Sequence, residues 1–389
     1  MAIRCDVEPS WLTVGCALPL IARLIPTTTR VVYCAAYYPR RAMEDTMTDL
    51  NSDPRIDPRI KQAMGAFPPL TQDNANSREQ ILEEANTPEA SAMRQGMEAM
   101  FELVDNEQIV PSAGLDISTH EFTSAPDGNT IKVQFIRPQG SQTLPCVYYI
   151  HGGGMQSMSC FLGLYRAWGK MIAHQGVAVA MVDFRNCVTP SSAPEVAPYP
   201  AGLNDCVAGI KWLASQAHQL HIDPAHIIIA GESGGGNLTL ATGLRLKQEG
   251  ELGLIRGLYA LCPYIAGAWP QEKYPSSTEN NGILLDLHSN RGAMAYGIEE
   301  FEKRNLLAWP AFATEEDVRG LVPTFISVNE CDPLRDEGIE FYRLLLRAGV
   351  PARCRQVMGT IHGSEIFVVA TPEISRDTAS SIARFCKQT

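Results

Sequence analysis

Short apolar runs recur along the chain from about residue 131 onward, and they alternate with stretches whose apolar residues follow helical spacing. The run over 177–184 is almost continuously apolar, which is typical of a strand that is covered on both faces. This alternation predicts an α/β fold with a mostly parallel central sheet and helices on both faces. Strands are predicted over 131–137, 145–150, 177–184, 227–230, 258–262, 324–329 and 354–357, and helices over 164–175, 201–219, 238–248, 336–348 and 376–387.

Two segments depart from this alternation. Residues 43–115 read as helix and loop, with proline breaks and a helical pattern over 93–104. Residues 267–321 contain no clear strand but carry two tryptophans and many polar side chains. An insertion over the carboxyl ends of the strands would have the composition of 267–321, so we expect this segment to contribute to a cap together with N-terminal cap helices over 43–115. The main domain is expected over 116–389.

The beginning of the chain differs in composition from everything that follows. An apolar run over 11–22 has the length of a signal-peptide core, but acidic residues precede it and Pro19 interrupts it. The run is too short to span a bilayer, which needs about 20 apolar residues, so we expect no stable membrane association. We expect residues 1–42 to be an atypical, poorly ordered extension, with translation starting at Met43 or Met47. N-terminal sequencing of native protein that began at the first residue would contradict this interpretation.

A Gly-x-Ser-x-Gly motif lies at the junction of a predicted strand and a predicted helix. The apolar run 227–230 leads into Gly-Glu-Ser-Gly-Gly at 231–235, and helical spacing follows. A serine on a sharp strand-to-helix turn exposes its hydroxyl, and flanking glycines let the backbone close that tightly. The motif predicts Ser233 as a nucleophile; the alternative is a glycine-rich turn without chemistry. Its glycine spacing does not fit a dinucleotide-binding loop, and a P-loop would need a Gly-Lys-Ser/Thr ending.

A nucleophilic serine needs a general base, and the base needs an acid that orients it. On this architecture the acid and then the histidine follow the serine along the chain. Asp332 lies in the turn after the predicted strand 324–329, and we favour it over Glu330 and Asp336, although it could instead cap the next helix. His362 follows the last predicted strand and is the last histidine of the chain, which makes it the candidate base.

Acyl transfer also needs backbone N–H groups that stabilise a developing oxyanion. Three glycines follow His151 at the end of a predicted strand. No side chains shield their backbone N–H groups, so two of these groups can point at a substrate oxygen. The residue after the nucleophile supplies the third donor. We therefore predict an oxyanion hole made by Gly152, Gly153 and Gly234, with a flexible turn as the alternative for the glycine run. This chemistry needs no metal and no organic cofactor.

Composition narrows the class of partner. The formal net charge of the 389 residues is −11, and no basic stripe offsets it, so a nucleic-acid partner is not expected. The eleven cysteines are scattered, odd in number and without a Cys-x-x-Cys pair, which predicts neither a disulfide framework nor a zinc site. A reducing compartment, the cytoplasm, is the expected location.

Together these motifs resemble the α/β-hydrolase fold and, within it, the hormone-sensitive-lipase family of bacterial esterases. The resemblance covers roughly residues 50–389. It rests on His-Gly-Gly-Gly at 151–154, Gly-Glu-Ser-Gly-Gly-Gly-Asn at 231–237, Asp-Pro-Leu at 332–334 and His-Gly at 362–363. Glu232 and Gly234 stand where the family more often has Asp and Ala, and this departure bears on substrate preference.

The resemblance implies that Ser233, Asp332 and His362 are the catalytic triad of a serine carboxylesterase. Such an enzyme would hydrolyse short- to medium-chain esters through an acyl-enzyme, with a small-molecule ester as its partner. A homodimer could form at the edge made by 336–348 and the last strand. Two other functions stay open from the residues: an amidase or peptidase with the same triad, and a non-catalytic ligand-binding protein of this fold. Four apolar residues after the glycine run either line a substrate cleft or pack in the core: Met155, Met158, Phe161 and Leu162.

Overall fold

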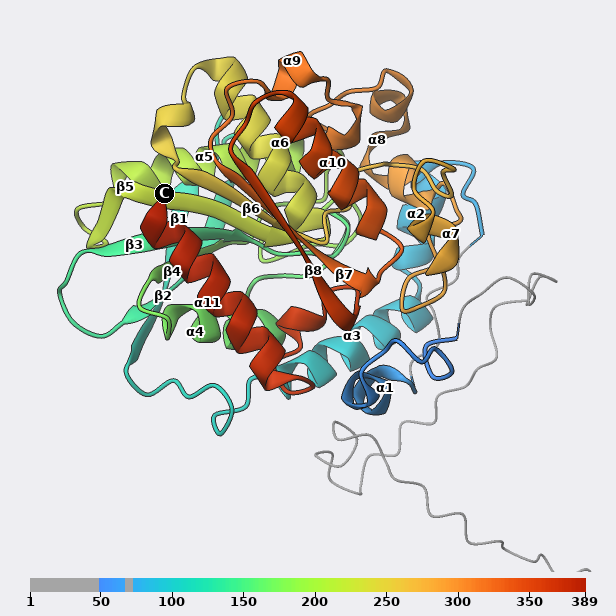
Figure 1. Cartoon of the computed structure of the whole chain (residues 1–389), viewed down its shortest axis with the longest axis horizontal. Helices are drawn as coiled ribbons and strands as arrows, with labels where there is room; N and C mark the ends of the chain where they lie inside the picture. Colours follow the sequence, from blue (N-terminus) through green and yellow to red (C-terminus); the bar gives the residue numbers. More distant parts are fainter. Residues whose placement is uncertain (1–48, 67–72) are drawn as a thin grey trace, which may run out of the picture.

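One eight-stranded sheet forms the centre of the computed structural model, which describes residues 49–66 and 73–389 (Figure 1). The predicted extension over 1–42 lies outside these residues. The strands are ordered β1-β2-β4-β3-β5-β6-β7-β8; the pairs β1–β2 and β2–β4 are antiparallel and the others are parallel, as the sequence predicts for most of the sheet. The strands are β1 (Leu115–Thr123), β2 (Thr130–Pro138), β3 (Leu144–Ile150), β4 (Ala178–Val182), β5 (Ile222–Glu232), β6 (Gly257–Leu261), β7 (Thr324–Cys331) and β8 (Ala352–Ile361).

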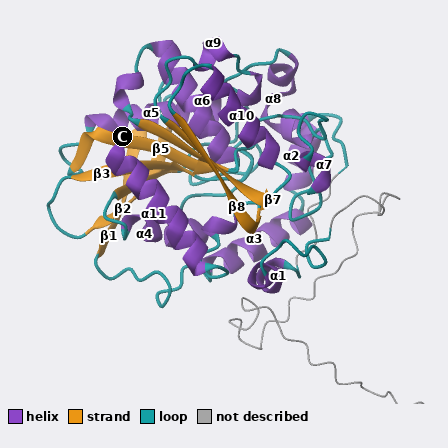
Figure 2. Ribbon diagram, in the orientation of Figure 1, coloured by secondary structure: helices purple, strands orange, loops and turns teal. Residues whose placement is uncertain are grey.

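Helices cover both faces of this sheet (Figure 2), which confirms the predicted fold class. The helices α4 and α11 pack on one face, and α5, α6 and α10 pack on the other. The helices are α1 (Pro58–Met64), α2 (Arg78–Ala85), α3 (Pro88–Glu102), α4 (Gly163–Ala173), α5 (Ala201–Ser215), α6 (Gly234–Glu249), α7 (Ser276–Glu279), α8 (Arg291–Glu302), α9 (Glu315–Val318), α10 (Arg335–Arg347) and α11 (Pro372–Gln388).

The central strands send alternate side chains into two separate apolar cores. On β3, Val147 and Tyr149 belong to the core that contains Trp168 of α4, whereas Tyr148 and Ile150 belong to the core on the opposite face. This is the two-residue period of a strand that is buried on both sides. The sheet is therefore fixed from both faces, and its carboxyl edge is a rigid platform for the loops that follow β3, β5, β7 and β8.

Two elements differ from the prediction. The strand β1 was not predicted, because only Leu115 and Phe122 of its nine residues are buried and no apolar run marks it. It lies at the sheet edge, where pairing with β2 and not burial defines it. The helix α6 begins at Gly234, four residues before the predicted start at 238, since glycines carry no apolar pattern. The chain thus passes from strand to helix across a single residue, Ser233.

The two segments predicted to form a cap meet in the structure. Helix α2 packs against α8, and both lie on the same side of the molecule as α7 (Figure 1). Arg291 of α8 pairs with Glu84 of α2. Asn290, just before α8, accepts from the amide of Ala75 at 2.8 Å and donates to its carbonyl at 2.9 Å. Residues 267–321, all of them described, contain helices and one isolated bridge but no strand, as predicted.

No helix in the described ranges combines the length and the hydropathy that crossing a membrane requires. The eight cysteines in these ranges are free, and all except Cys354 are buried. Those buried thiols act there as small apolar side chains.

Candidate active site

Ser233 occupies the strained turn between β5 and α6. Its φ of 57° and ψ of −120° lie in a region that non-glycine residues rarely adopt. The backbone is fixed on both sides, because its amide donates to the carbonyl of Leu261 at 3.0 Å and its carbonyl accepts from the amide of Asn237 at 3.0 Å. A Cβ on Gly235 would come within 2.0 Å of the carbonyl oxygen of Ile150, so only glycine allows α6 to start this close to β3.

The structure brings the three residues predicted as a triad into one hydrogen-bonded chain. Nε2 of His362 lies 2.9 Å from the hydroxyl oxygen of Ser233, and Nδ1 lies 2.8 Å from Oδ2 of Asp332. Asp332 is fully buried, and its other oxygen accepts from the amide of Leu334 at 2.9 Å. Asn280, in the loop after α7, donates to the backbone carbonyl of Asp332 at 3.1 Å. The carboxylate is thus held by its own turn while it faces the imidazole.

The two rival carboxylates are used elsewhere. Glu330 accepts from the amide of Gly359 at 2.7 Å, which ties the end of β7 to β8. Asp336 accepts from the amide of Ser276 at 2.7 Å and pairs with Arg335 at 2.9 Å. Asp332 alone among the three hydrogen bonds to His362 within the described residues.

The glycine loop after β3 lies directly against the start of α6. Gly153 and Gly154 both have positive φ, 92° and 63°, which glycine adopts without strain. A Cβ on Gly234 would come within 2.8 Å of the amide nitrogen of Gly154 and 2.6 Å of that of Met155. Within the described residues, the amides of Gly153, Gly154 and Gly234 have no hydrogen-bond acceptor. These three amides are the ones available to a ligand atom beside Ser233.

The expectation for Gly152 has to be corrected. Its amide does not face the site: it donates to Oε1 of Glu232 at 2.6 Å and to the hydroxyl of Tyr165 at 3.0 Å. An amide with two internal acceptors is not free to stabilise a substrate oxygen. Gly154, the last glycine of the run, takes its place as a candidate donor beside Gly153.

Known proteins share this fold. A family model described as the alpha/beta hydrolase fold matches residues 147–366, which is more than half of the chain. The chain belongs to the α/β-hydrolase fold family.

Several solved structures and curated relatives to which this α/β-hydrolase is similar are esterases. The esterase Est22 is 69% identical, with a TM-score of 0.86 over 87% of this chain and 100% of that chain. Brefeldin A esterase, a bacterial homologue of human hormone-sensitive lipase, is 33% identical, with a TM-score of 0.76 over 87% of this chain and 95% of that chain. The carboxylesterase NlhH of Mycobacterium tuberculosis is 28% identical over 335 residues, which span 85% of this chain and 95% of that protein. The resemblance to the hormone-sensitive-lipase family is thereby confirmed.

The glycine loop of this α/β-hydrolase is supported from behind by the segment that follows β4. The amides of Cys187 and Val188 donate to the carbonyls of Met155 and Gln156, at 2.9 and 3.1 Å. The side chain of Asn186 donates to the carbonyl of Met158 at 2.8 Å. The ring of His151 stacks on Phe184 with centroids 4.3 Å apart. Three backbone carbonyls of the loop are therefore held by hydrogen bonds.

Burial and charge act in opposite directions on His362. Burial alone would lower the pKa of the imidazole, but the Asp332 carboxylate raises it well above its ordinary value. The thiol of Cys262, which follows β6, lies in the same cluster, and burial raises its pKa to about 11, so it is a neutral neighbour at pH 7. The donor atoms of Cys262, Asp332 and His362 lie within 4.8 Å of one another and form the one group in the described ranges that could hold a metal ion. Two of the three already bond to each other.

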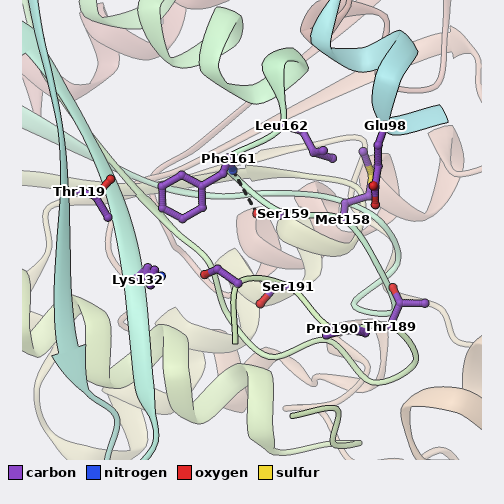
Figure 3. A pocket seen from close by; sticks show the side chains of 11 residues that line it. Glu98, Thr119, Lys132, Met158, Ser159, Phe161, Leu162, Thr189, Pro190 and Ser191 are labelled. Carbon is purple, nitrogen blue, oxygen red and sulfur yellow. Dashed lines mark hydrogen bonds between the residues drawn. The ribbon is translucent and has the colours of Figure 1, made fainter. Parts of the chain in front are cut away.

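The residues predicted to line a cleft separate into two groups. Met155 is buried and packs in the core. Met158, Phe161 and Leu162 line a cavity of about 450 Å³ (Figure 3). The same cavity is lined by residues of α3, of the β1–β2 edge and of the loop 189–192, and no triad residue lines it. Because Ser233, Asp332 and His362 do not line it, this cavity is separate from the predicted triad.

Sequence reasoning missed the side chains that hold the site in place. Glu232 was noted only as a departure from the family pattern, although it binds the glycine loop. Asn237 donates to the carbonyls of Tyr264 and Ala308, at 2.9 and 3.0 Å, and so joins α6 to the segment 267–321. Asn237 belongs to the recognised motif and could have been flagged, whereas no local pattern reveals which partner Glu232 contacts.

Proposed function

We propose that this α/β-hydrolase is a serine carboxylesterase in which Ser233 is the nucleophile, His362 the general base and Asp332 the residue that orients the base. The observation that supports this most strongly is the unbroken chain of hydrogen bonds from Asp332 through His362 to Ser233, at 2.8 and 2.9 Å, on a strained turn beside free amides. Each part of this arrangement has a defined task in acyl transfer.

The reaction begins when Nε2 of His362 takes the proton of the Ser233 hydroxyl as its oxygen attacks the ester carbonyl. The amides of Gly153, Gly154 and Gly234 receive the oxyanion that forms. The protonated His362 then gives its proton to the departing alcohol, which leaves an acyl-enzyme. Water, activated by the same imidazole, releases the acid and restores the serine. Asp332 stabilises the imidazolium in both steps.

The proposed substrates are carboxylic esters with short to medium acyl chains. The relatives support the reaction class: Est22 is an esterase that has been solved with p-nitrophenol, and NlhH is a carboxylesterase. These names do not favour the amidase or peptidase alternative. A non-catalytic binding protein would not need the proton path from Asp332 to Ser233, so that alternative is disfavoured as well.

Three further parts of the proposal concern organisation and location. We infer that α1 to α3, together with 267–321, act as a cap, which is supported by the contacts between α2 and α8. We infer a homodimer at the edge strand β8, which pairs only with β7 and exposes 62% of Met358. Free, mostly buried cysteines in the described ranges fit a cytoplasmic location. Light scattering of the purified protein tests the dimer directly.

The test is hydrolysis of a p-nitrophenyl ester series, from acetate to palmitate, by the wild type and by Ser233→Ala. We expect turnover that peaks at short chains and falls in the variant by about 10³-fold or more, because the nucleophile is lost. Ser215→Ala, which removes a hydroxyl at the end of α5, is the matched control and should retain wild-type rates. Turnover that survives in Ser233→Ala would mean that another group is the nucleophile, and a wild type inert on every ester would refute the proposed activity.

A further inference from the structure

The residue before the nucleophile carries a buried carboxylate that touches three other parts of the molecule. Glu232 is only 2% exposed. Its Oε2 accepts from the hydroxyl of Tyr149 on β3 at 2.6 Å. Its Oε1 accepts from the hydroxyl of Tyr165 on α4 at 2.6 Å and from the amide of Gly152 at 2.6 Å. All of these donors are neutral, and no lysine, arginine or histidine of the described residues hydrogen bonds or pairs with this carboxylate.

A buried carboxylate without a cation is costly unless several donors meet it. Burial raises the pKa of Glu232 to about 7, while the two tyrosines and the Gly152 amide act against that rise. An apolar residue at this position would avoid burying a charge but would leave the hydroxyl of Tyr149 and the amide of Gly152 without this acceptor. The carboxylate is therefore matched to the donors that surround it. What it provides is a fixed point for the glycine loop, because its contact with Gly152 spans eighty positions of the sequence.

The contact between Glu232 and Gly152 restricts the backbone positions of Gly153 and Gly154. A Cβ on Gly152 would lie 2.5 Å from Oε1 of Glu232, so the carboxylate occupies the space where any other residue would place its side chain. Gly152 is one peptide from Gly153 and two from Gly154. Glu232 is one peptide from Ser233, whose own backbone is fixed at the elbow. The Glu232 side chain therefore links the backbone beside Ser233 directly to the start of the glycine loop, whose other end is held by the segment after β4.

We propose that Glu232 is a positioning residue: by binding the amide of Gly152, it holds the glycine loop so that the amides of Gly153 and Gly154 face the oxygen that becomes negative after attack by Ser233. This inference rests on the proposed function, since it assigns a role in the same acyl transfer. It predicts a loss in the chemical step and not in substrate binding, because the oxyanion exists only after attack.

Three variants separate positioning from simple structural support. Glu232→Gln keeps the size but replaces one acceptor oxygen with an NH₂ donor, which faces either the Gly152 amide or a tyrosine hydroxyl that must stop donating in order to accept it. Glu232→Leu removes both acceptors. Glu232→Asp keeps the carboxylate on a shorter stem. We expect kcat to fall about 10- to 100-fold in Glu232→Gln and Glu232→Leu, with KM within about threefold of wild type. Deleting one oxyanion donor typically lowers the rate about 10²–10³-fold, and displacing the Gly153 and Gly154 amides should cost somewhat less. Asp should recover part of the loss.

The matched control is Glu337 of α10, a second buried carboxylate with three donors. It accepts from the amides of Ile265 and Ala266, at 2.7 and 3.1 Å, and from the indole of Trp269 at 2.6 Å. Glu337→Gln should lower the melting temperature as much as Glu232→Gln does but leave kcat within about threefold of wild type, because it does not contact the glycine loop.

Each outcome decides a different question. Activity is expressed per active site, counted by the burst of p-nitrophenol released on phosphonylation by a p-nitrophenyl phosphonate. If Ser233→Ala abolishes turnover but Glu232→Gln and Glu232→Leu keep wild-type kcat, the positioning role is refuted while the esterase stands. Equal losses of kcat in Glu232→Gln and Glu337→Gln would also refute it, since any buried carboxylate would then serve. If Glu232→Gln and Glu232→Leu do not fold, Glu232→Asp decides the question. A wild-type kcat at unchanged KM in this variant refutes the positioning role, and a several-fold fall in kcat supports it.

Discussion

Replacing Asp332 by asparagine tests the proposed proton path with the smallest change in shape. The carboxylate accepts two hydrogen bonds on different oxygens, one from Nδ1 of His362 at 2.8 Å and one from the amide of Leu334 at 2.9 Å. An amide side chain has only one acceptor oxygen. The Asp332→Asn variant can therefore satisfy one of these donors but not both.

Either orientation of the new amide damages the base. If its oxygen stays on Leu334, its NH₂ group donates to Nδ1 of His362, which moves the imidazole proton to Nε2 and leaves no acceptor for the Ser233 hydroxyl. If its oxygen faces His362 instead, two donors oppose each other at Leu334, at a cost of about 1–3 kcal/mol. The charge-assisted bond to the imidazolium is lost in both cases, which removes about 1.5–3 kcal/mol more from the transition state. The transition-state loss alone corresponds to a fall in kcat of about 10- to 150-fold, the wrong tautomer of the first orientation lowers kcat further, and the cost at Leu334 lowers the melting temperature.

The assay is hydrolysis of p-nitrophenyl butyrate between pH 6 and 10, with the melting temperature measured beside it. Glu330→Gln is the control, because Glu330 is the nearby rival carboxylate and its contact to Gly359 needs only one acceptor oxygen. We expect it to retain kcat within about threefold. An Asp332→Asn variant that melts like wild type and keeps more than a tenth of its kcat would refute the assignment of Asp332, as would an equal loss in Glu330→Gln.

Three further predictions concern the pH dependence of activity, the pH dependence of stability and the fit of the glycine loop. The base must be neutral to act, so kcat/KM should rise with pH through the raised pKa of His362 and be highest under alkaline conditions; a profile flat from pH 6 would contradict this. The free energy of unfolding should change in the opposite direction, because folding raises the pKa values of His362, Glu232 and Glu337, and the stabilisation of a group with a raised pKa is lost as pH rises through its folded value. For Glu232 the rise from 4.5 to about 7 corresponds to about 3 kcal/mol between pH 4 and 8, which denaturant titration at the two pH values would detect. Gly234→Ala should lower kcat about 10-fold at near-constant KM, because the new methyl would come within 2.8 Å of the Gly154 amide; steady-state kinetics with wild-type kcat would show that the loop yields.

The sequence was sufficient for the fold class because the central strands are buried on both faces. Apolar runs such as 177–184 and 227–230 have no other common interpretation once helical patterns separate them. The strand β1 carries no such signal, since Asp116 to Glu121 face mostly outward and are held by pairing with β2. Backbone pairing leaves no mark on the side-chain pattern, so this strand could be found only in the structure.

The site was predictable to the extent that its residues lie in local motifs. Ser233, Asp332 and His362 each follow a predicted strand in the order that the fold requires, and the structure brings all three together. The sequence indicated that the glycine loop supplies backbone amides, but it did not indicate which of these amides are free to bind a substrate oxygen. Which glycine faces inward depends on Glu232, which is distant in sequence and whose contacts follow from the register of β3 against β5.

Two buried carboxylates flank Ser233, the proposed nucleophile, and their surroundings suit them to different tasks. In the proposed mechanism, Asp332 faces an imidazole that becomes positive during the reaction, so its charge would stabilise the transition state directly. Glu232 faces only hydroxyl and amide donors, which gain no charge, so its effect on the reaction is geometric. One carboxylate acts on the proton and the other on the position of the oxyanion. The elbow connects them, since the strained backbone of Ser233 begins one residue after Glu232, and the side chain of Ser233 meets the imidazole that Asp332 holds. A rigid sheet that is buried on both faces is what allows such charges and strain to be kept in place.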